Sequence, residues 1–154
     1  MTTNQAAKLQ IEVVPQTCWY KNLRLMLPKS EWDHLRKMAY NKYKYRCAIC
    51  GGKGNKHPVE AHEKWEYDES TGIQKLVDII ALCPACHEVV HFGLACMRGN
   101  EGRALEHLQK VNGWNYFDAI QHVDDAKAAY KRRSCMEWKT DVSLIKEWLE
   151  INSK

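Results

Sequence analysis

Two pairs of closely spaced cysteines lie in the middle of the chain, Cys47 with Cys50 and Cys83 with Cys86. Four thiolates from two such Cys-x-x-Cys knuckles can surround one tetrahedral zinc ion, and a reducing compartment favours metal over disulfides. The 32 residues between the knuckles exceed the roughly 15 to 20 of a compact zinc ribbon, so we expect a two-stranded hairpin between them. We therefore predict a structural zinc, which would contribute directly to the free energy of folding.

A second set of residues combines imidazoles with carboxylates. His87 and His91 lie four positions apart, so on a helix both rings can face one ion. A strand that carries His62 could bring a third imidazole to the same point. Glu63 follows His62 directly, and Asp78 lies shortly before the second knuckle. These residues predict a divalent-metal site separate from the four cysteines.

Hydrophobic periodicity and turn residues predict the elements that must position these groups. Ser30 and Asp33 form a capping-box pattern at the start of one helix, and Pro84 and Gly93 bracket a short helix that carries both late histidines. In chain order we predict an extended segment over 11–27, a helix over 30–44, strands over 59–67 and 74–82, a short helix over 84–92, and helices over 101–112, 116–133 and 142–151. The histidines elsewhere, His34, His107 and His122, are interpreted as surface or packing residues.

Length and composition indicate an ordinary globular protein. The chain has 154 residues, of which 45% are hydrophobic and 27% charged, so we expect a single domain over 1–154 rather than a disordered tail. The apolar run Ile79–Cys83 is far shorter than the roughly 20 residues of a membrane span, and we expect no membrane partner. Residues 1–14 contain no apolar signal-peptide region, so we expect a cytoplasmic location.

The net charge of +4 permits an anionic partner, and one stretch concentrates the positive charge. Between Arg36 and Arg46 there are five basic residues and no acidic one, with three tyrosines interleaved. Such a stretch is either a phosphate-contacting stripe or a solvated helix face. The candidate nucleic-acid contacts are Arg36, Lys37, Lys42, Lys44 and Arg46, with Lys64 on the predicted hairpin.

The order of these motifs resembles that of a known family. From residue 46 to 93 the chain carries Cys-x-x-Cys, a strand with a histidine, a polar residue and then Leu-Cys-x-x-Cys-His-x-x-x-His. This order is similar to that of the HNH nucleases, which have a ββα-metal (His-Me finger) core and, in this form, a four-cysteine structural zinc. The resemblance implies an α+β fold: a treble-clef-like, zinc-bound core over 46–93, an N-terminal strand and helix before it, and a helical extension over 94–154.

The same resemblance implies roles for individual residues. His87 and His91 fall at helix positions that bind the catalytic divalent ion, and Asp78 stands near the place of an asparagine that orients the base or the loop. The strand departs from the family, because Ala61 precedes His62 where a ligand is common. One alignment makes His62 the general base, and the other makes His62 a ligand and Glu63 the base. We favour His62 as the base.

The expected function is a metal-dependent endonuclease that hydrolyses phosphodiester bonds, with double-stranded DNA as its partner. A positioned base and one divalent ion suffice for this reaction, and the ion could be Mg²⁺, Mn²⁺ or a transition metal. Two alternatives stay open. The chain could bind nucleic acid without cutting it, or it could be a zinc-stabilised inhibitor or adaptor that binds a protein partner through its helices and its six tryptophans.

Overall fold

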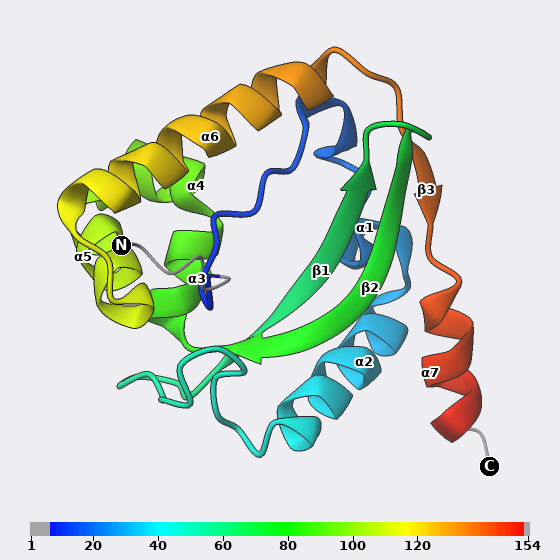
Figure 1. Cartoon of the computed structure of the whole chain (residues 1–154). Coiled ribbons are helices and arrows are strands. Elements are labelled where there is room, and N and C mark those ends of the chain that lie inside the picture. The colour runs from blue at the N-terminus through cyan, green and yellow to red at the C-terminus, as the bar shows by residue number, and fades with distance from the viewer. Residues whose placement is uncertain (1–6, 153–154) are drawn as a thin grey trace.

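The structure, a computed structural model, describes residues 7–152 and the side chains of residues 7–149. In this range the protein is a mixed α+β fold with one three-stranded sheet (Figure 1). The elements before the sheet are a 3-10 helix at Gln16–Cys18, α1 (Leu23–Met26) and α2 (Lys29–Lys42). After β1 and β2 come α3 (Pro84–Val90), α4 (Phe92–Met97), α5 (Glu101–Asn112), α6 (Tyr116–Ser134), β3 (Lys139–Asp141) and α7 (Leu144–Asn152).

The sheet is built on a long antiparallel hairpin of β1 (Glu60–Asp68) and β2 (Ile73–Leu82). Gly72 adopts a left-handed φ of 70° at the turn, which a glycine does without strain. His62 pairs with Ile80, and the register shifts between Lys64 and Trp65. Both strands confirm the predicted hairpin to within a residue at each end. The short β3 was not predicted; it pairs with β2 in parallel, so β1 is an edge strand of the sheet.

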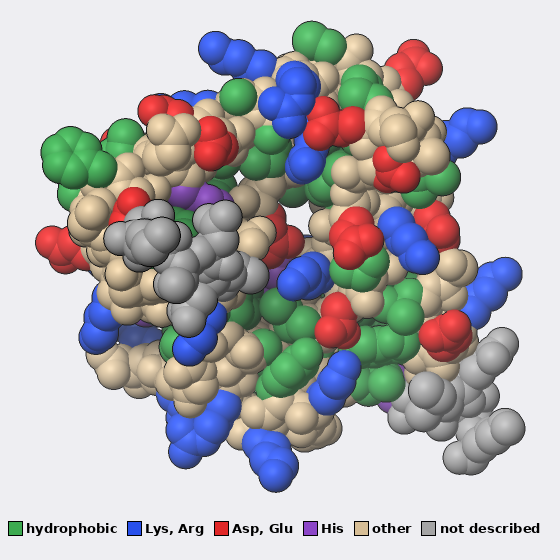
Figure 2. All heavy atoms as spheres, in the orientation of Figure 1, with side chains coloured by type: hydrophobic (Ala, Val, Ile, Leu, Met, Phe, Trp, Pro, Cys, Tyr) green, Lys and Arg blue, Asp and Glu red, His purple; other side chains and the backbone are tan. Residues whose placement is uncertain are grey.

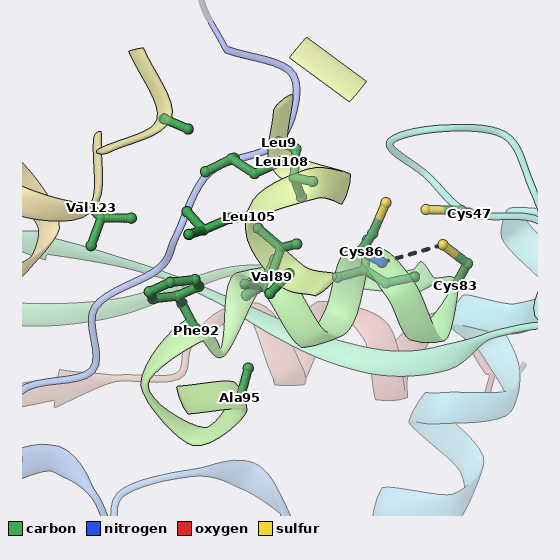
Figure 3. Close-up of a cluster of buried hydrophobic side chains, with 14 of the residues drawn as sticks. Leu9, Cys47, Cys83, Cys86, Val89, Phe92, Ala95, Leu105, Leu108 and Val123 are labelled. Atoms are coloured by element: carbon green, nitrogen blue, oxygen red, sulfur yellow. Dashed lines mark hydrogen bonds between the residues drawn. The ribbon is translucent and has the colours of Figure 1, made fainter. Parts of the chain in front are cut away.

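The hairpin separates two hydrophobic cores. On one face, Ile80 and Leu82 pack with α3, α5 and the N-terminal Leu9. Figure 3 shows the sulfurs of Cys47, Cys83 and Cys86 at one end of this cluster. On the other face, Leu76 and Ile79 pack against α2 and α7. Because β2 is covered on both faces, it carries a continuous apolar run instead of alternating apolar and polar residues.

The short helix after the second knuckle divides in two. His91 has φ −98° and ψ 52° and ends α3, and α4 begins at Phe92, whose ring is buried in the first core. The single helix predicted over 84–92 is therefore too long by two residues, and Gly93 lies inside α4 rather than after a helix end. The break turns the chain so that Phe92 is buried while His91 stays near His87.

The predicted strand in the N-terminal segment is wrong. No strand precedes β1 in residues 7–59, and residues 16–18 and 23–26 are helical. The backbone N–H groups of this segment instead donate to other partners: Leu9 to the Asn112 side chain, Ile11 to His122 and Glu12 to the Val90 carbonyl. Figure 1 shows the segment running beside the hairpin, between α3 and the end of α6.

The capping box predicted at Ser30 is also absent. Pro28 occupies the N-cap of α2 without a side-chain hydrogen bond, and the Asp33 carboxylate accepts from the Arg36 guanidinium at 3.0 Å. A capping box does form at the start of α6, between Asn115 and Asp118. The predicted boundaries of α5 and α6 agree with the structure to within a residue.

None of the helices in the described range combines the length and the apolar character that a membrane crossing requires.

Candidate metal centres

The four knuckle cysteines converge in the structure. Their Sγ atoms all lie within 4.8 Å of one another, and Cys50 Sγ is 3.7 Å from Cys83 Sγ. Zn–S bonds of about 2.3 Å in a tetrahedron place the sulfurs roughly 3.8 Å apart, whereas a disulfide requires about 2.05 Å. The sulfurs thus have the spacing of zinc ligands, and the donor set fits the predicted zinc.

Hydrogen bonds prepare these sulfurs to carry negative charge. Cys47 Sγ accepts from the backbone N–H groups of Ile49 and Cys50, and Cys83 Sγ accepts from that of Cys86 (Figure 3). The hydrogen bond from the Cys86 thiol lowers the pKa of Cys47 to about 4, while burial raises the pKa of Cys83 to about 11. Among the thiols, these contacts favour the ionised form most strongly at Cys47. A positive ion would favour ionisation of all four.

Three histidines form a second cluster. His62 from β1, His87 from α3 and His91 from the α3–α4 break each offer a ring nitrogen, and these nitrogens lie within 4.8 Å of one another. The ring centroids are 5.4 Å (His62 to His87), 5.3 Å (His62 to His91) and 4.8 Å (His87 to His91) apart. The two helix histidines and the strand histidine therefore meet at one point, as their spacing predicted.

Two carboxylates orient the rings of this cluster. His62 Nε2 lies 2.8 Å from Glu12 Oε2, and His87 Nδ1 lies 3.2 Å from Glu60 Oε1. Because an ionised carboxylate only accepts hydrogen bonds, each of these ring nitrogens carries the proton, and the other nitrogen of each ring keeps its lone pair. Metal-binding histidines commonly have such carboxylate partners.

Burial favours the neutral form of two rings of this cluster, His87 and His91. Burial lowers the pKa of His91 to about 3, with further lowering by His87 and His62. Burial, with a smaller effect of His62, also lowers the pKa of His87. Neutral imidazoles present lone pairs, which a metal ion or a proton-transfer reaction needs.

The three histidines line one side of a cleft of about 340 Å³. The cleft lies between β1 and the segment that contains the 3-10 helix and α1, and its other walls include Trp19, Trp32, Lys21 and Arg24. Its volume lies in the range typical of small-ligand sites, about 300 to 1,000 Å³. The histidine cluster is thus open to a molecule of nucleotide size, although His62 itself is only 4% exposed.

The two other candidate carboxylates bind elsewhere. Glu63 follows His62 on β1 and lines the same cleft, but its carboxylate accepts from the Leu23 backbone N–H at 2.6 Å, at the start of α1. Burial raises the pKa of Glu63. Asp78 is 3.7 Å from the Lys42 ammonium and accepts from the Tyr43 hydroxyl at 3.4 Å. The structure brings neither carboxylate into the histidine cluster.

The predicted basic stripe is partly neutralised. Arg36 pairs with Asp33, and Lys42 pairs with Asp78. Lys37, Lys44 and Lys64 are exposed, and no ion pair is found for them among the side chains of residues 7–149. The Arg46 guanidinium reaches only the Gly51 carbonyl oxygen, at 3.5 Å. Three lysines of the stripe and hairpin, with Arg46, therefore remain available to an anion.

Sequence reasoning missed three contributors to the two centres. Glu12 belongs to a segment predicted as a strand, and nothing in the sequence signals its approach to His62 across 50 positions. Glu60 lies two positions before His62, and its place on the same face of the strand was a usable signal. His107 was interpreted as a surface or packing residue, but its Nε2 lies 3.2 Å from Cys86 Sγ.

Comparisons with known proteins add no relative: no family model, no curated protein and no solved structure matches this chain.

Proposed function

We propose that this chain is a metal-dependent endonuclease of the HNH type that hydrolyses phosphodiester bonds in DNA. The convergence of His62, His87 and His91 on one point of an accessible cleft carries the proposal. The unit β1–β2–α3 has the strand, strand and helix order that the resemblance implies, with the four-cysteine cluster at its base. The order of the motifs in the sequence and the convergence of the three histidines in space thus favour the same site.

His87 and His91 are the residues we assign to the divalent ion. They come from adjacent turns of the chain, and their ring centroids are 4.8 Å apart. A divalent ion held there would stabilise the negative charge that develops on the phosphoryl group and the leaving oxygen. Imidazole ligands suit Mn²⁺ less well than later transition metals, so the proposal calls for a test of several ions.

His62 is the residue we assign as the general base. Its Nε2–H donates to Glu12, which leaves the Nδ1 lone pair free to take a proton from an attacking water. The carboxylate also stabilises the imidazolium that results from that transfer. This arrangement favours His62 over Glu63, because the Glu63 carboxylate already accepts from the Leu23 N–H.

The test is cleavage of a supercoiled plasmid by purified protein with Mg²⁺, Mn²⁺, Zn²⁺, Co²⁺, Ni²⁺ or EDTA. We expect nicking that requires a divalent ion and that falls at least a hundredfold in His62→Ala and in His87→Ala. His34→Ala is the matched control, because His34 is exposed on α2 and outside both clusters. All three variants are purified in the same way as the unaltered protein. A contaminating nuclease would then nick the plasmid equally in every preparation.

Metal binding separates the two roles. If His62 is the base, His62→Ala retains the divalent ion while His87→Ala loses it, as measured by competition with a chromophoric chelator. Loss of the ion from both variants would make His62 a ligand and leave the base unassigned. Absence of nicking by the unaltered protein with every ion would contradict the proposal and favour a binding module for nucleic acid or for a protein.

A further inference from the structure

We infer that the cleft beside the histidine cluster binds an unpaired nucleotide, so that the strand to be cut is single-stranded or locally opened at the site. The inference rests on the proposed function for the reaction, but it concerns binding and can be tested without cleavage. It identifies the form of the substrate, which neither the motifs nor the resemblance determines.

The first argument is the shape of the site. The histidines lie on the wall of a cleft of about 340 Å³, and His62 is almost fully buried. The phosphates of a duplex lie on its outside, but its paired strands make it too wide to enter a cleft of this volume, so a strand reaches the recessed histidines when it is unpaired there. A single nucleotide can enter a cleft of this volume together with its phosphate.

The second argument is an aromatic platform at the mouth of the cleft. The Trp19 side chain is half exposed, at 50%, yet it is held in place. Its indole N–H donates to the Val14 carbonyl oxygen at 3.1 Å, and its ring stacks on Tyr130 at 6.5 Å with 25° between the planes. Trp32 and Trp65 line the same cleft. Unpaired bases stack on such rings regardless of sequence.

The third argument is the positive charge beside this platform. The Arg24 guanidinium is exposed and has no ion pair with a side chain of residues 7–149. The Lys21 ammonium donates to an uncharged group, the Trp138 carbonyl oxygen, at 3.1 Å. The carboxylates of the cleft are already engaged, Glu12 by His62 and Glu63 by the Leu23 N–H. Two cations therefore remain to bind phosphate next to the aromatic rings.

A neighbouring cleft differs from the cleft beside the histidine cluster in its balance of charge. Figure 2 shows the molecule hollowed at the centre of the view, and a cleft of about 840 Å³ lies between the N-terminal segment, β1 and α6. Its carboxylates outnumber its lysines and arginines: it has Glu12, Glu66, Asp68, Glu69 and Asp125 against Lys8, Lys64 and Arg133. A polyanion is repelled there, although the cleft is larger.

The experiment measures the binding of fluorescein-labelled oligonucleotides by anisotropy, at one salt concentration and without added divalent ion. The probes are dT10, rU10 and a ten-base-pair DNA duplex. We expect dT10 or rU10 to bind at least tenfold more tightly than the duplex. Trp19→Ala and Arg24→Ala should each weaken binding of the preferred single strand by roughly five- to a hundredfold.

Matched controls come from exposed residues away from the cleft. Phe117→Ala removes an aromatic ring that is 79% exposed at the start of α6, and Arg98→Ala removes a cation at the end of α4. Both should leave binding unchanged, and thermal melts should show all four variants folded. Equal binding of duplex and single strand, or unchanged binding by Trp19→Ala, would overturn the inference.

The binding experiment and the plasmid cleavage assay can fail independently of each other. Plasmid nicking with no effect of Trp19 on single-strand binding would contradict the cleft inference alone. Tight, Trp19-dependent binding of a single strand by a protein that cuts nothing would contradict the nuclease proposal alone.

Discussion

The pairing of imidazoles with carboxylates gives the histidine cluster its chemical character. Glu12 and Glu60 fix the protonated nitrogens of His62 and His87, so that each ring has one defined lone pair. Glu12 reaches His62 from an N-terminal segment that is fixed by hydrogen bonds to α3, α5 and α6. A residue outside the hairpin and helix thus completes the site.

Glu12 is a positioning residue, and its removal should affect proton transfer more than metal binding. We predict that Glu12→Gln lowers the rate of plasmid cleavage by about ten- to a hundredfold while the affinity for the divalent ion changes less than threefold. The glutamine amide oxygen can still accept a hydrogen bond from the His62 N–H, but without a negative charge it does not stabilise an imidazolium as a carboxylate does.

Two comparisons check this assignment of Glu12. Glu12→Asp, which keeps the charge, should recover part of the rate, and Glu66→Gln on the exposed part of β1 should leave it unaltered. Full cleavage activity in Glu12→Gln would contradict a role for the Glu12 carboxylate in the reaction.

Glu63 provides the converse case, a carboxylate whose role is structural. We predict that Glu63→Gln keeps cleavage within threefold of the unaltered protein, because the Gln side-chain oxygen can still accept from the Leu23 N–H. Glu63→Ala should lower the free energy of unfolding by about 1 to 3 kcal/mol, since a part-buried N–H loses its acceptor. Urea denaturation measures the second effect. A hundredfold loss of cleavage in Glu63→Gln would instead identify Glu63 as the base.

At the scale of elements, the sequence predicts the segments whose pattern reflects what they bury. The run Ile79–Leu82 predicts a strand because both faces of β2 are covered, and Gly113 ends α5 in a left-handed conformation with φ 66°. The strand β3 has only three residues and no alternation, and it pairs with β2 because α6 carries the chain to that edge. Its formation depends on the tertiary fold.

In the N-terminal segment the reverse happens: a strand is predicted over 11–27, and none forms in those residues. Its apolar residues Ile11, Val13 and Val14 are typical of a strand, but the backbone N–H groups of Leu9 and Ile11 donate to the side chains of Asn112 and His122, about 100 residues later in the chain. Local pattern cannot reveal such partners. For the same reason the histidines could be predicted from helical spacing within α3, whereas the contact of Glu12 with His62 could not.

The zinc knuckles should stabilise the elements that carry the histidines. Cys83 is the N-cap of α3 and belongs to the first core, so loss of a zinc ligand there should release both α3 and the hairpin end. We predict that Cys83→Ser loses one equivalent of zinc, measured by atomic emission, and the cooperative thermal transition seen by circular dichroism. Cys135→Ser is the control, because Cys135 is exposed and outside the cluster. Unchanged zinc content in Cys83→Ser would contradict the four-cysteine centre.

At the scale of the whole molecule, charge is distributed unevenly around the site. The cleft beside the histidines offers unpaired cations, and the larger cleft is rich in carboxylates. The basic stripe from Arg36 to Arg46, on α2 and just after it, keeps only part of its charge. The sequence predicts the stripe from composition alone, but it cannot show that Asp33 and Asp78 neutralise two of its members. A nucleic acid that enters the cleft would meet Lys37 and Lys44 only if it extends along α2.

The salt dependence of binding measures that extension. Each phosphate neutralised by a cation contributes about −0.7 to the slope of log K against log salt for a single strand. If Lys37 and Lys44 both contact phosphates, the double variant Lys37→Gln with Lys44→Gln should reduce the slope by roughly 1.4 and weaken binding at low salt. Glutamine, like lysine, is unbranched at Cβ and Cγ, so that the left-handed φ of 55° at position 44 is occupied by a residue of similar steric demand near the backbone.

The matched control is the double variant Lys110→Gln with Lys127→Gln, which removes the same charge from exposed positions of α5 and α6. It should leave the slope unchanged, because only cations that contact the strand release counterions. An equal effect of both double variants would mean that net charge alone attracts the strand and that the stripe forms no defined path. A reduced slope for the stripe variant alone, together with a loss in Trp19→Ala, would trace a strand from α2 to the histidine cleft.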